Sequence, residues 1–348
     1  DDDVYKDEFH GKKSLFFLGF YSSAVKPILL VVTEPNPSDR LISCLAVTPA
    51  GWDKVLLDNF TSKNSAESAK KLKQVLSAKL NAKLMQVTDP TLSTQILSLE
   101  EKDPSKSKQF CVGVVYAKDG QKDEVQMFGN EHGSKVFYEF MDLIATRIQL
   151  EGWSKFRGGL DVKSLTKGKE SYFTNYKDQF DIMFHVSTLL PFDPTDEQKI
   201  ERKNMIGNDM VVIIFQEGET PYHPLTIRGH MNHVFIVVRW RKDPNGDTIY
   251  SMEVASKSQV LPHQPHLPNY RNFYPKEIRE FLLTKVVNSY QSVIKCPSVV
   301  HMYRTPREMF LKELVDSAVP KSDLAKLRKS TSLATTTSGR MDLLESLK

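Results

Sequence analysis

Cysteine is scarce in this chain of 348 residues, which has only Cys44, Cys111 and Cys296. An odd number of widely separated cysteines is typical of reduced thiols in a cytosolic protein and argues against a disulfide framework. Long apolar runs are also lacking. Residues 28–32 and 211–215 fall far short of the ~20 residues that a spanning helix needs, and no basic-then-apolar signal segment opens the chain. We therefore expect a soluble, cytoplasmic protein without a transmembrane segment.

A concentration of basic charge is lacking as well. The formal net charge is +4, and residues 321–348 hold six Lys or Arg against three Asp or Glu, a difference of three, so the remainder is almost neutral. A nucleic-acid-binding body gathers its basic residues on one face or stripe, and no such stripe is visible. We expect no nucleic-acid partner.

The length indicates about two domains of ~100 to 200 residues each. Hydrophobic residues make up 40% and charged residues 26% of the chain, which is ordinary for a globular protein. The chain begins at Asp1-Asp2-Asp3 rather than at a methionine. We expect it to be part of a longer protein, in which other regions provide any peripheral attachment to membranes.

Strand-like runs and two amphipathic helices occupy the first half of the chain. The runs lie at residues 15–20, 28–32, 41–47 and 110–116. Turns with polar residues or proline separate them, and the pattern predicts a largely antiparallel sheet. Apolar residues at helical spacing predict helices over residues 65–80 and 134–149. We expect residues 1–152 to form a sheet-rich domain.

A domain boundary is predicted near Trp153, where the chain enters a glycine-containing stretch. Strands are predicted at 179–187, 210–216, 234–239 and 248–254, and helices at 195–206 and 275–294. They indicate an α/β domain over residues 153–319. Its last helix should start with Thr305 as the cap and Pro306 as the first residue, and should seal this domain. Residues 320–348 are expected to form a flexible, basic tail rich in Ser and Thr.

An asparagine follows the charged helix, within Arg202-Lys203-Asn204-Met205-Ile206-Gly207-Asn208-Asp209. A primary carboxamide carries a donor and an acceptor a short distance apart, so Asn208 could bind a water molecule and a phosphate oxygen together. GTP hydrolysis depends mostly on positioning that water and on stabilising negative charge. The alternative is that the Gly-Asn pair only ends a helix.

Three strings in the same order and spacing resemble the Rap GTPase-activating protein family. They are Phe156-Arg157-Gly158-Gly159-Leu160-Asp161, then Ile182-Met183-Phe184-His185-Val186-Ser187-Thr188-Leu189-Leu190-Pro191, then Ile206-Gly207-Asn208-Asp209. The likeness covers roughly residues 156–317. It implies an α/β (α+β) protein in which a mostly antiparallel sheet domain with helices precedes an α/β catalytic domain.

The resemblance implies that Asn208 is the family's asparagine thumb, which orients the attacking water in a GTP-bound, Rap-type small GTPase. The chain would then be a GTPase activator without a reaction of its own. It would need no cofactor or metal, because the partner binds GTP and Mg²⁺. Contacts with the GTPase are expected at Arg202, Lys203, Asn204, Met205, Asp209 and Arg157. For the charges on the helix, plain solvation of the surface is the alternative.

The segment at Phe9-His10-Gly11-Lys12-Lys13 is similar to the one that opens the family's dimerisation domain. This similarity implies a homodimer that associates through the N-terminal domain. The alternative is a scaffold that only packs on the catalytic domain, because domain and subunit interfaces use similar surfaces.

One departure from the family bears on activity. The family usually carries Arg-His directly before Ile-Gly-Asn-Asp, whereas this chain has Asn204 and Met205. The change removes a cation and a hydrogen-bonding ring, so activity could be lower or the partner different. Two alternatives stay open: an activator of a Rheb- or Ral-type GTPase, and a non-catalytic dimeric scaffold that binds a small GTPase.

Other motifs predict chemistry less well. Residues 167–171 lack the leading glycine and the Ser or Thr of a phosphate-binding loop. His223, His230 and His233 lie in a segment interrupted by proline and glycine without a nearby cysteine, which argues against a metal site. Arg157 is a candidate arginine finger, although we prefer a docking or structural role for it.

Overall fold

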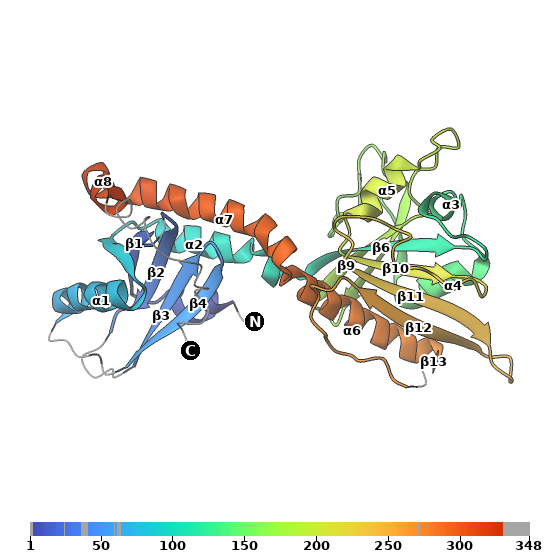
Figure 1. The fold of residues 1–348 in the computed structure, drawn as a ribbon, viewed down its shortest axis with the longest axis horizontal. Coiled ribbons are helices and arrows are strands. Elements are labelled where there is room, and N and C mark those ends of the chain that lie inside the picture. The colour runs from blue at the N-terminus through green and yellow to red at the C-terminus, as the bar shows by residue number, and fades with distance from the viewer. Residues whose placement is uncertain are drawn as a thin grey trace. The chain divides into compact units, whose positions relative to one another are not determined.

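The computed structural model describes residues 3–23, 25–35, 41–58, 60, 64–269 and 272–329, with the backbone alone for Ser65, Ser105 and Lys329. These residues divide into two compact units (Figure 1). One unit comprises the described residues up to Lys106 together with those from Val300 onward, and the other runs from Ser107 to Val299. The first unit is therefore built from two separate stretches of the chain.

An antiparallel sheet in the order β4-β3-β2-β1-β5 forms the centre of the first unit. Its strands are β1 (Ser14–Tyr21), β2 (Pro27–Thr33), β3 (Leu41–Thr48), β4 (Gly51–Asp58) and β5 (Ala82–Val87). Along β2, Ile28, Leu30 and Val32 pack on one face, whereas Leu29 and Val31 pack on the other. Both faces are apolar, so both must be covered.

Helices provide the cover on each face (Figure 1). On one face, α1 (Ser65–Lys79) packs Leu72 and Leu76 against the strands. The other face is covered by a π-helix (Tyr5–Phe9), α2 (Leu92–Glu101), α7 (Pro297–Ala318) and α8 (Lys321–Lys329). A 3-10 turn (Pro104–Lys106) follows α2.

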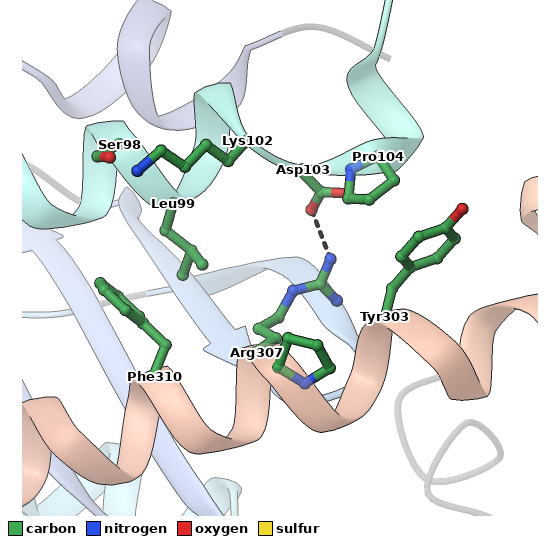
Figure 2. Close-up of a pocket in the computed structure, with 9 residues that line it drawn as sticks. Ser98, Leu99, Lys102, Asp103, Pro104, Tyr303, Arg307 and Phe310 are labelled. Carbon is green, nitrogen blue, oxygen red and sulfur yellow. Dashed lines mark hydrogen bonds and ion pairs between the residues drawn. The ribbon is translucent and has the colours of Figure 1, made fainter. Parts of the chain in front are cut away.

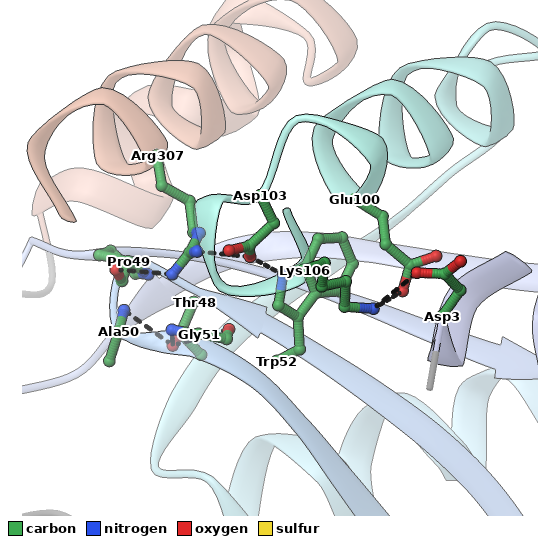
Figure 3. A network of polar contacts seen from close by, with 10 residues as sticks. All are labelled: Asp3, Thr48, Pro49, Ala50, Gly51, Trp52, Glu100, Asp103, Lys106 and Arg307. Atoms are coloured by element: carbon green, nitrogen blue, oxygen red, sulfur yellow. Dashed lines mark hydrogen bonds and ion pairs between the residues drawn. The ribbon is translucent and has the colours of Figure 1, made fainter. Parts of the chain in front are cut away.

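Buried charges also join the layers of this unit. Asp103 accepts hydrogen bonds from Trp52 Nε1 and from Arg307 of α7, each at 2.6 Å (Figure 3). Glu100 accepts from two backbone N–H groups of the π-helix, at 2.8 and 2.9 Å. The Asp103 and Arg307 pair borders a cavity of about 250 Å³ between α2 and α7 (Figure 2). Charge as well as apolar contact therefore fixes α7 to this unit.

A mixed sheet in the order β13-β12-β11-β10-β6-β9-β8-β7 forms the second unit. Its strands are β6 (Gln109–Ala117), β7 (Thr146–Gln149), β8 (Glu170–Tyr176), β9 (Phe180–Val186), β10 (Val211–Gln216), β11 (Val234–Lys242), β12 (Thr248–Ser256) and β13 (Asn272–Phe273). β6 runs parallel to β9 and β10, and β10 runs parallel to β11. The outer strands pair in antiparallel fashion.

Helices cover both faces of this sheet too. They are α3 (Glu124–Phe128), α4 (Lys135–Ile144), α5 (Ile200–Gly207) and α6 (Pro275–Ile294). On one face, Val212 and Ile214 of β10 pack in a cluster with residues of α3 and α5. On the other, Phe215 packs against the rings of Phe137 and Phe140 of α4, and α6 contacts α4. The helix that precedes Asn208 therefore lies on the α3 face.

The predicted fold class is confirmed, since an antiparallel sheet with helices is followed by a mixed sheet with helices. Within the ranges given above, no helix has both the length and the apolar character that crossing a membrane requires.

The two units do not divide the chain near Trp153; they divide it after Lys106 and again after Val299. Residues 110–116 belong to the second sheet as β6, because a strand buried on both faces suits the parallel centre of a sheet. The last long helix seals the first unit rather than the second, through Leu311, Leu314 and Val315.

The helix predicted over 134–149 ends at Ile144. Ala145 is extended, and the next four residues form β7 opposite β8, so Ile148 lies in a strand. The β-branched Thr146 and Ile148 suit a strand. The predicted helix was too long because the helical spacing of apolar residues continues past Ile144 into the strand.

The C-terminal predictions also need correction. α7 begins at Pro297, so Pro306 lies inside it and Thr305 is not its cap. Proline is preferred at the first helical position, and in α7 the proline at that position is Pro297. Residues 321–329 of the predicted flexible tail form α8, because Leu327 is buried against the first sheet. Residues 330–348 lie outside the described residues.

Candidate functional site

The helix before Asn208 is shorter than predicted. Asp196 accepts a hydrogen bond from the backbone N–H of Ile200 at 2.6 Å, and Lys199 has a left-handed backbone with φ 54°. α5 therefore begins at Ile200, and a carboxylate complements its positive end. Asp193, farther from α5, accepts a hydrogen bond from the backbone N–H of Thr195 at 2.7 Å.

Asn208 is the residue that ends α5. Its side chain is exposed, and its Nδ2 donates to the carbonyl of Asn204 one turn earlier at 2.8 Å. Ile206 is fully buried and Asp209 is only 3% exposed. The exposed amide therefore stands on a backbone that is held by buried side chains nearby.

A groove of about 290 Å³ opens beside this amide. Its lining residues come from α3, from α5 with Asn208, and from the loop before β11; they are Glu124, Phe128, Lys203, Asn204, Gly207, Asn208, Ile227, Arg228, Gly229, His230 and Met231. Arg228 is exposed on the loop side. The groove thus leaves Asn208 accessible between one wall that carries Arg228 and another that carries Lys203 paired with Glu124.

His185 joins the three strings that resemble the Rap GTPase-activating family. Its Nδ1 lies 2.8 and 3.0 Å from the two carboxylate oxygens of Asp209, and its Nε2 lies 2.8 Å from the carbonyl oxygen of Gly158. Gly158 has φ +58°, and a Cβ there would meet Met183 at 2.9 Å. The glycine loop, the β9 strand and the residue after Asn208 therefore meet at one buried ring.

The charge state of this ring follows from its partners. Burial by itself lowers the pKa of His185, but the Asp209 carboxylate offsets this effect and raises the pKa well above 6.5. A protonated ring donates from both nitrogens, which suits the two acceptors it faces. We conclude that a buried, charged hydrogen bond fixes the backbone directly after Asn208.

Cys111 lies beside the pair, and the thiol, ring and carboxylate groups lie within 4.8 Å of one another, a spacing that a metal ion could bridge. Both nitrogens of His185 are already engaged, by Asp209 and by Gly158. A metal would have to displace one of these hydrogen bonds. The arrangement suits a structural hydrogen-bonded cluster better than a metal site.

Gly113 lets α5 approach the sheet closely. It lies opposite His185 in the pairing of β6 with β9. A Cβ at Gly113 would come within 2.8 Å of Ile206 Cγ2 and 3.1 Å of Asp209 Oδ2. The missing side chain therefore makes room for the buried residues on either side of Asn208.

The predicted contact residue Arg202 is not on the surface. It is 2% exposed, and its guanidinium donates to four backbone carbonyls, those of Phe128, Asn130, Leu190 and Pro191. Burial lowers its pKa to about 10. A planar fork with five donors can serve several carbonyls at once. Arg202 thus holds α5 in place and cannot meet a partner directly.

The other predicted contacts differ in exposure. Lys203 is 25% exposed and pairs with Glu124 at 3.0 Å. Asn204 is exposed, whereas Met205 is partly buried and packs against the apolar cluster below α5. Asp209 is turned inward to His185, which corrects its predicted role as a contact. Arg157 is exposed next to the buried Gly158 but does not line the groove.

Two residues near the groove escaped prediction. Arg228 lines it from the loop, and the buried Asn232 bonds to the backbone on both sides of Asn208. Both lie in a polar segment rich in turn-forming residues, where arginine and asparagine are common without a special role. Only the folded loop brings them to α5.

The profile of the Rap/ran-GAP family matches residues 127–308, which is more than half of the chain. The chain belongs to the Rap/Ran-GAP family. The match takes in the residues that line the groove beside Asn208, except Glu124, and the three groups that meet at His185. It begins before residue 156, where the resemblance in the sequence begins.

Proteins that are similar to this Rap/Ran-GAP chain match it over different lengths. Signal-induced proliferation-associated 1-like protein 2 of Homo sapiens is 40% identical over 233 residues, which is 66% of this chain and 13% of that protein. GTPase-activating Rap/Ran-GAP domain-like protein 3 of Gallus gallus is 33% identical over 324 residues, 91% of this chain and 34% of that protein. The chain thus spans a minor part of both relatives.

A solved structure is also similar. Its title is "Structure of the TSC2 GAP domain", and the two chains are 23% identical with a TM-score of 0.44. The similarity covers 60% of this chain and 99% of that chain.

Proposed function

We propose that this Rap/Ran-GAP chain is a GTPase activator that accelerates GTP hydrolysis by a GTP-bound, Rap-type small GTPase. Asn208 enters the partner's nucleotide site and orients the attacking water. The observation that carries the proposal is the exposed Asn208 amide beside a groove, on a backbone that Ile206 and Asp209 hold from the buried side. The name of the relative from Gallus gallus, which includes "GTPase-activating", agrees with it.

The chemistry needs little from the activator beyond position and polarity. The amide oxygen of Asn208 accepts a hydrogen bond from the water, and the amide nitrogen donates to a phosphate oxygen. The partner holds GTP and Mg²⁺, and the activator improves the alignment of the water. Arg228, on the loop wall of the groove, complements a partner surface that carries negative charge, whereas Lys203 on the other wall is paired with Glu124.

An arginine finger is the rival chemistry, with Arg157 as the candidate. Arg157 is exposed but does not line the groove beside Asn208. Its neighbour Gly158 is held by His185 through the backbone carbonyl. These placements favour a docking role for Arg157 and leave the positioning of water to Asn208.

A panel of purified small GTPases tests the proposal. Rap-, Rheb- and Ral-type proteins are loaded with GTP, and phosphate release is followed after addition of substoichiometric chain. We expect the Rap-type protein to hydrolyse GTP faster by orders of magnitude, within the ~10³- to 10⁵-fold range known for such assistance. Acceleration of only a Rheb- or Ral-type protein would identify that GTPase as the partner in place of a Rap-type one. Binding without acceleration across the panel would contradict the proposal and favour a scaffold.

A further inference from the structure

Asn232 bonds to the backbone on both sides of Asn208. It lies just before β11, is fully buried, and donates from Nδ2 to the carbonyl of Ile206 at 2.9 Å and to that of Asp209 at 2.6 Å. The two carbonyls belong to residues that flank Gly207 and Asn208. One amide group therefore spans the segment that carries the exposed thumb.

The side-chain amide of Asn232, with the two hydrogen bonds that it donates, is called the clamp below, and it suits the end of a helix. The last carbonyls of an α-helix have no partner within the helix. The carbonyl of Ile206 also accepts from the backbone N–H of Asp209 at 3.0 Å, and Asp209 lies just beyond α5, so Asn232 joins the helix end to the residue that follows it. An asparagine NH₂ group offers two hydrogens, one for each carbonyl. Because Asn232 is fully buried, water cannot readily replace it there.

The loop before β11 closes over the same amide. A Cβ at Gly229 would lie 1.9 Å from Asn232 Oδ1 and 3.0 Å from the carbonyl oxygen of Gly207. Only glycine fits between the loop, the clamp and the end of α5. The loop wall and the helix wall of the groove are thus fixed to each other beside Asn208.

The oxygen atom of the Asn232 side-chain amide is in an unusual environment for a polar atom. Its Oδ1 is buried without a hydrogen-bond partner. A buried acceptor without a partner is unfavourable and needs an explanation. The side chain keeps this orientation because its two donated bonds hold the end of α5.

We propose that Asn232 is a positioning residue for Asn208, fixing the direction in which the thumb amide leaves the end of α5. The proposal rests on the proposed role of Asn208 in GTP hydrolysis. Misplacement of a group that positions a reactant by about 1 Å can cost ~10²-fold in rate. Loss of the clamp should therefore slow hydrolysis within the complex more than it weakens the complex.

Single-turnover hydrolysis separates these two effects. A GTP-loaded Rap-type GTPase is mixed with increasing concentrations of wild type or Asn232→Ala, which gives a limiting rate and a half-saturating concentration. We expect the limiting rate to fall by about 10- to 100-fold and the half-saturating concentration to change by less than about threefold. An unchanged limiting rate would overturn the proposal.

Ser171→Ala is the matched control. Ser171 is buried in the same unit and donates to the carbonyl of Phe184, so the variant also loses a buried bond from a side chain to the backbone. It should leave both kinetic quantities unchanged. If Asn232→Ala does not fold, Asn232→Ser, which keeps one donor, serves in its place with a smaller loss of rate.

A second readout needs no GTPase. The side-chain amide signals of Asn208 in a ¹⁵N NMR spectrum are assigned by their absence in Asn208→Ala. In Asn232→Ala they should shift and broaden, and in Ser171→Ala they should not. Unchanged signals would overturn the proposal even if wild type activated no GTPase, whereas inactive wild type alone would contradict only the proposed function.

Discussion

Asn208 and Asp209 are neighbours in opposite environments. Asp209 is 3% exposed and bonded to His185, whereas Asn208 is exposed and bonds back to the carbonyl of Asn204. Fixing a side chain in one orientation costs conformational entropy, and the cost is smaller when the backbone beneath it is already ordered. The buried His185 and Asp209 pair therefore orders the backbone next to the exposed Asn208.

Replacing Asp209 with Asn tests the charge of this pair. The proton on His185 stabilises the folded state, because its folded-state pKa is raised. That contribution is complete below the unfolded-state pKa of ~6.5 and is lost as pH rises through the raised folded-state value. Near neutral pH, we expect Asp209→Asn to lower the free energy of unfolding by about 3 to 5 kcal/mol.

Urea unfolding at about pH 6 and about pH 9 measures the effect. The free energy of unfolding of wild type should decline toward the higher pH by more than that of Asp209→Asn. The difference in free energy of unfolding between the two proteins should therefore be smaller at about pH 9 than at about pH 6. All other titrating groups are common to both proteins. Parallel declines would show that His185 carries no extra proton.

The sequence predicted some of these residues better than others. Asn208 was predicted because it is a carboxamide that follows a charged helix and belongs to the third of the three strings of family residues, and its exposure agrees with that prediction. Its role stays a prediction. The burial of Asp209 and Arg202 could not be read in the same way, because both lie in a polar stretch. Their partners, His185 and four backbone carbonyls, lie outside this stretch, and the carbonyls of Phe128 and Asn130 are far away in the sequence.

Among the elements, α5 is short and depends on tertiary contacts to stay in place. Its eight residues fall below the length at which an isolated helix is stable in water. Ile206 packs into the cluster beneath it, and Arg202 donates to carbonyls of the segments around it. The position of Asn208 therefore follows from how α5 is attached to the sheet.

Adjacent charges on α5 should respond differently to substitution. Arg202→Lys keeps a cation but cannot serve four carbonyls, so we expect a loss of at least about 2 kcal/mol in the free energy of unfolding. Lys203→Ala removes a partly exposed pair with Glu124 and should cost less than about 1 kcal/mol. Urea unfolding compares the two variants. Equal losses would contradict the buried role of Arg202.

Strand prediction worked best where the pattern was simplest. The continuous apolar run of β10 marks a central strand buried on both faces. β4 and β5 went unpredicted because exposed polar residues interrupt them at the edges of the first sheet. α7 was placed too late because a proline inside a long helix has the same local signature as a proline at its start.

In the whole molecule, the first unit combines an N-terminal sheet with the helices from Val300 onward. No local pattern reveals that residues so far apart in sequence share a core, which is why the predicted division near Trp153 differs from the observed units. The relative from Gallus gallus matches 91% of the chain, so similarity extends well beyond the residues around Asn208. Self-association through the N-terminal unit stays a prediction.

The most direct test of the central claim is the limiting rate of GTP hydrolysis when a Rap-type GTPase is saturated with Asn208→Ala. The account predicts a rate at least about 100-fold below that with wild type, with affinity for the GTP-bound partner largely kept, because the amide acts chiefly in the transition state. Asn208→Asp should also fail, because it loses the donor and places negative charge beside the phosphate. Full activity of Asn208→Ala would contradict the account and direct attention to Arg157.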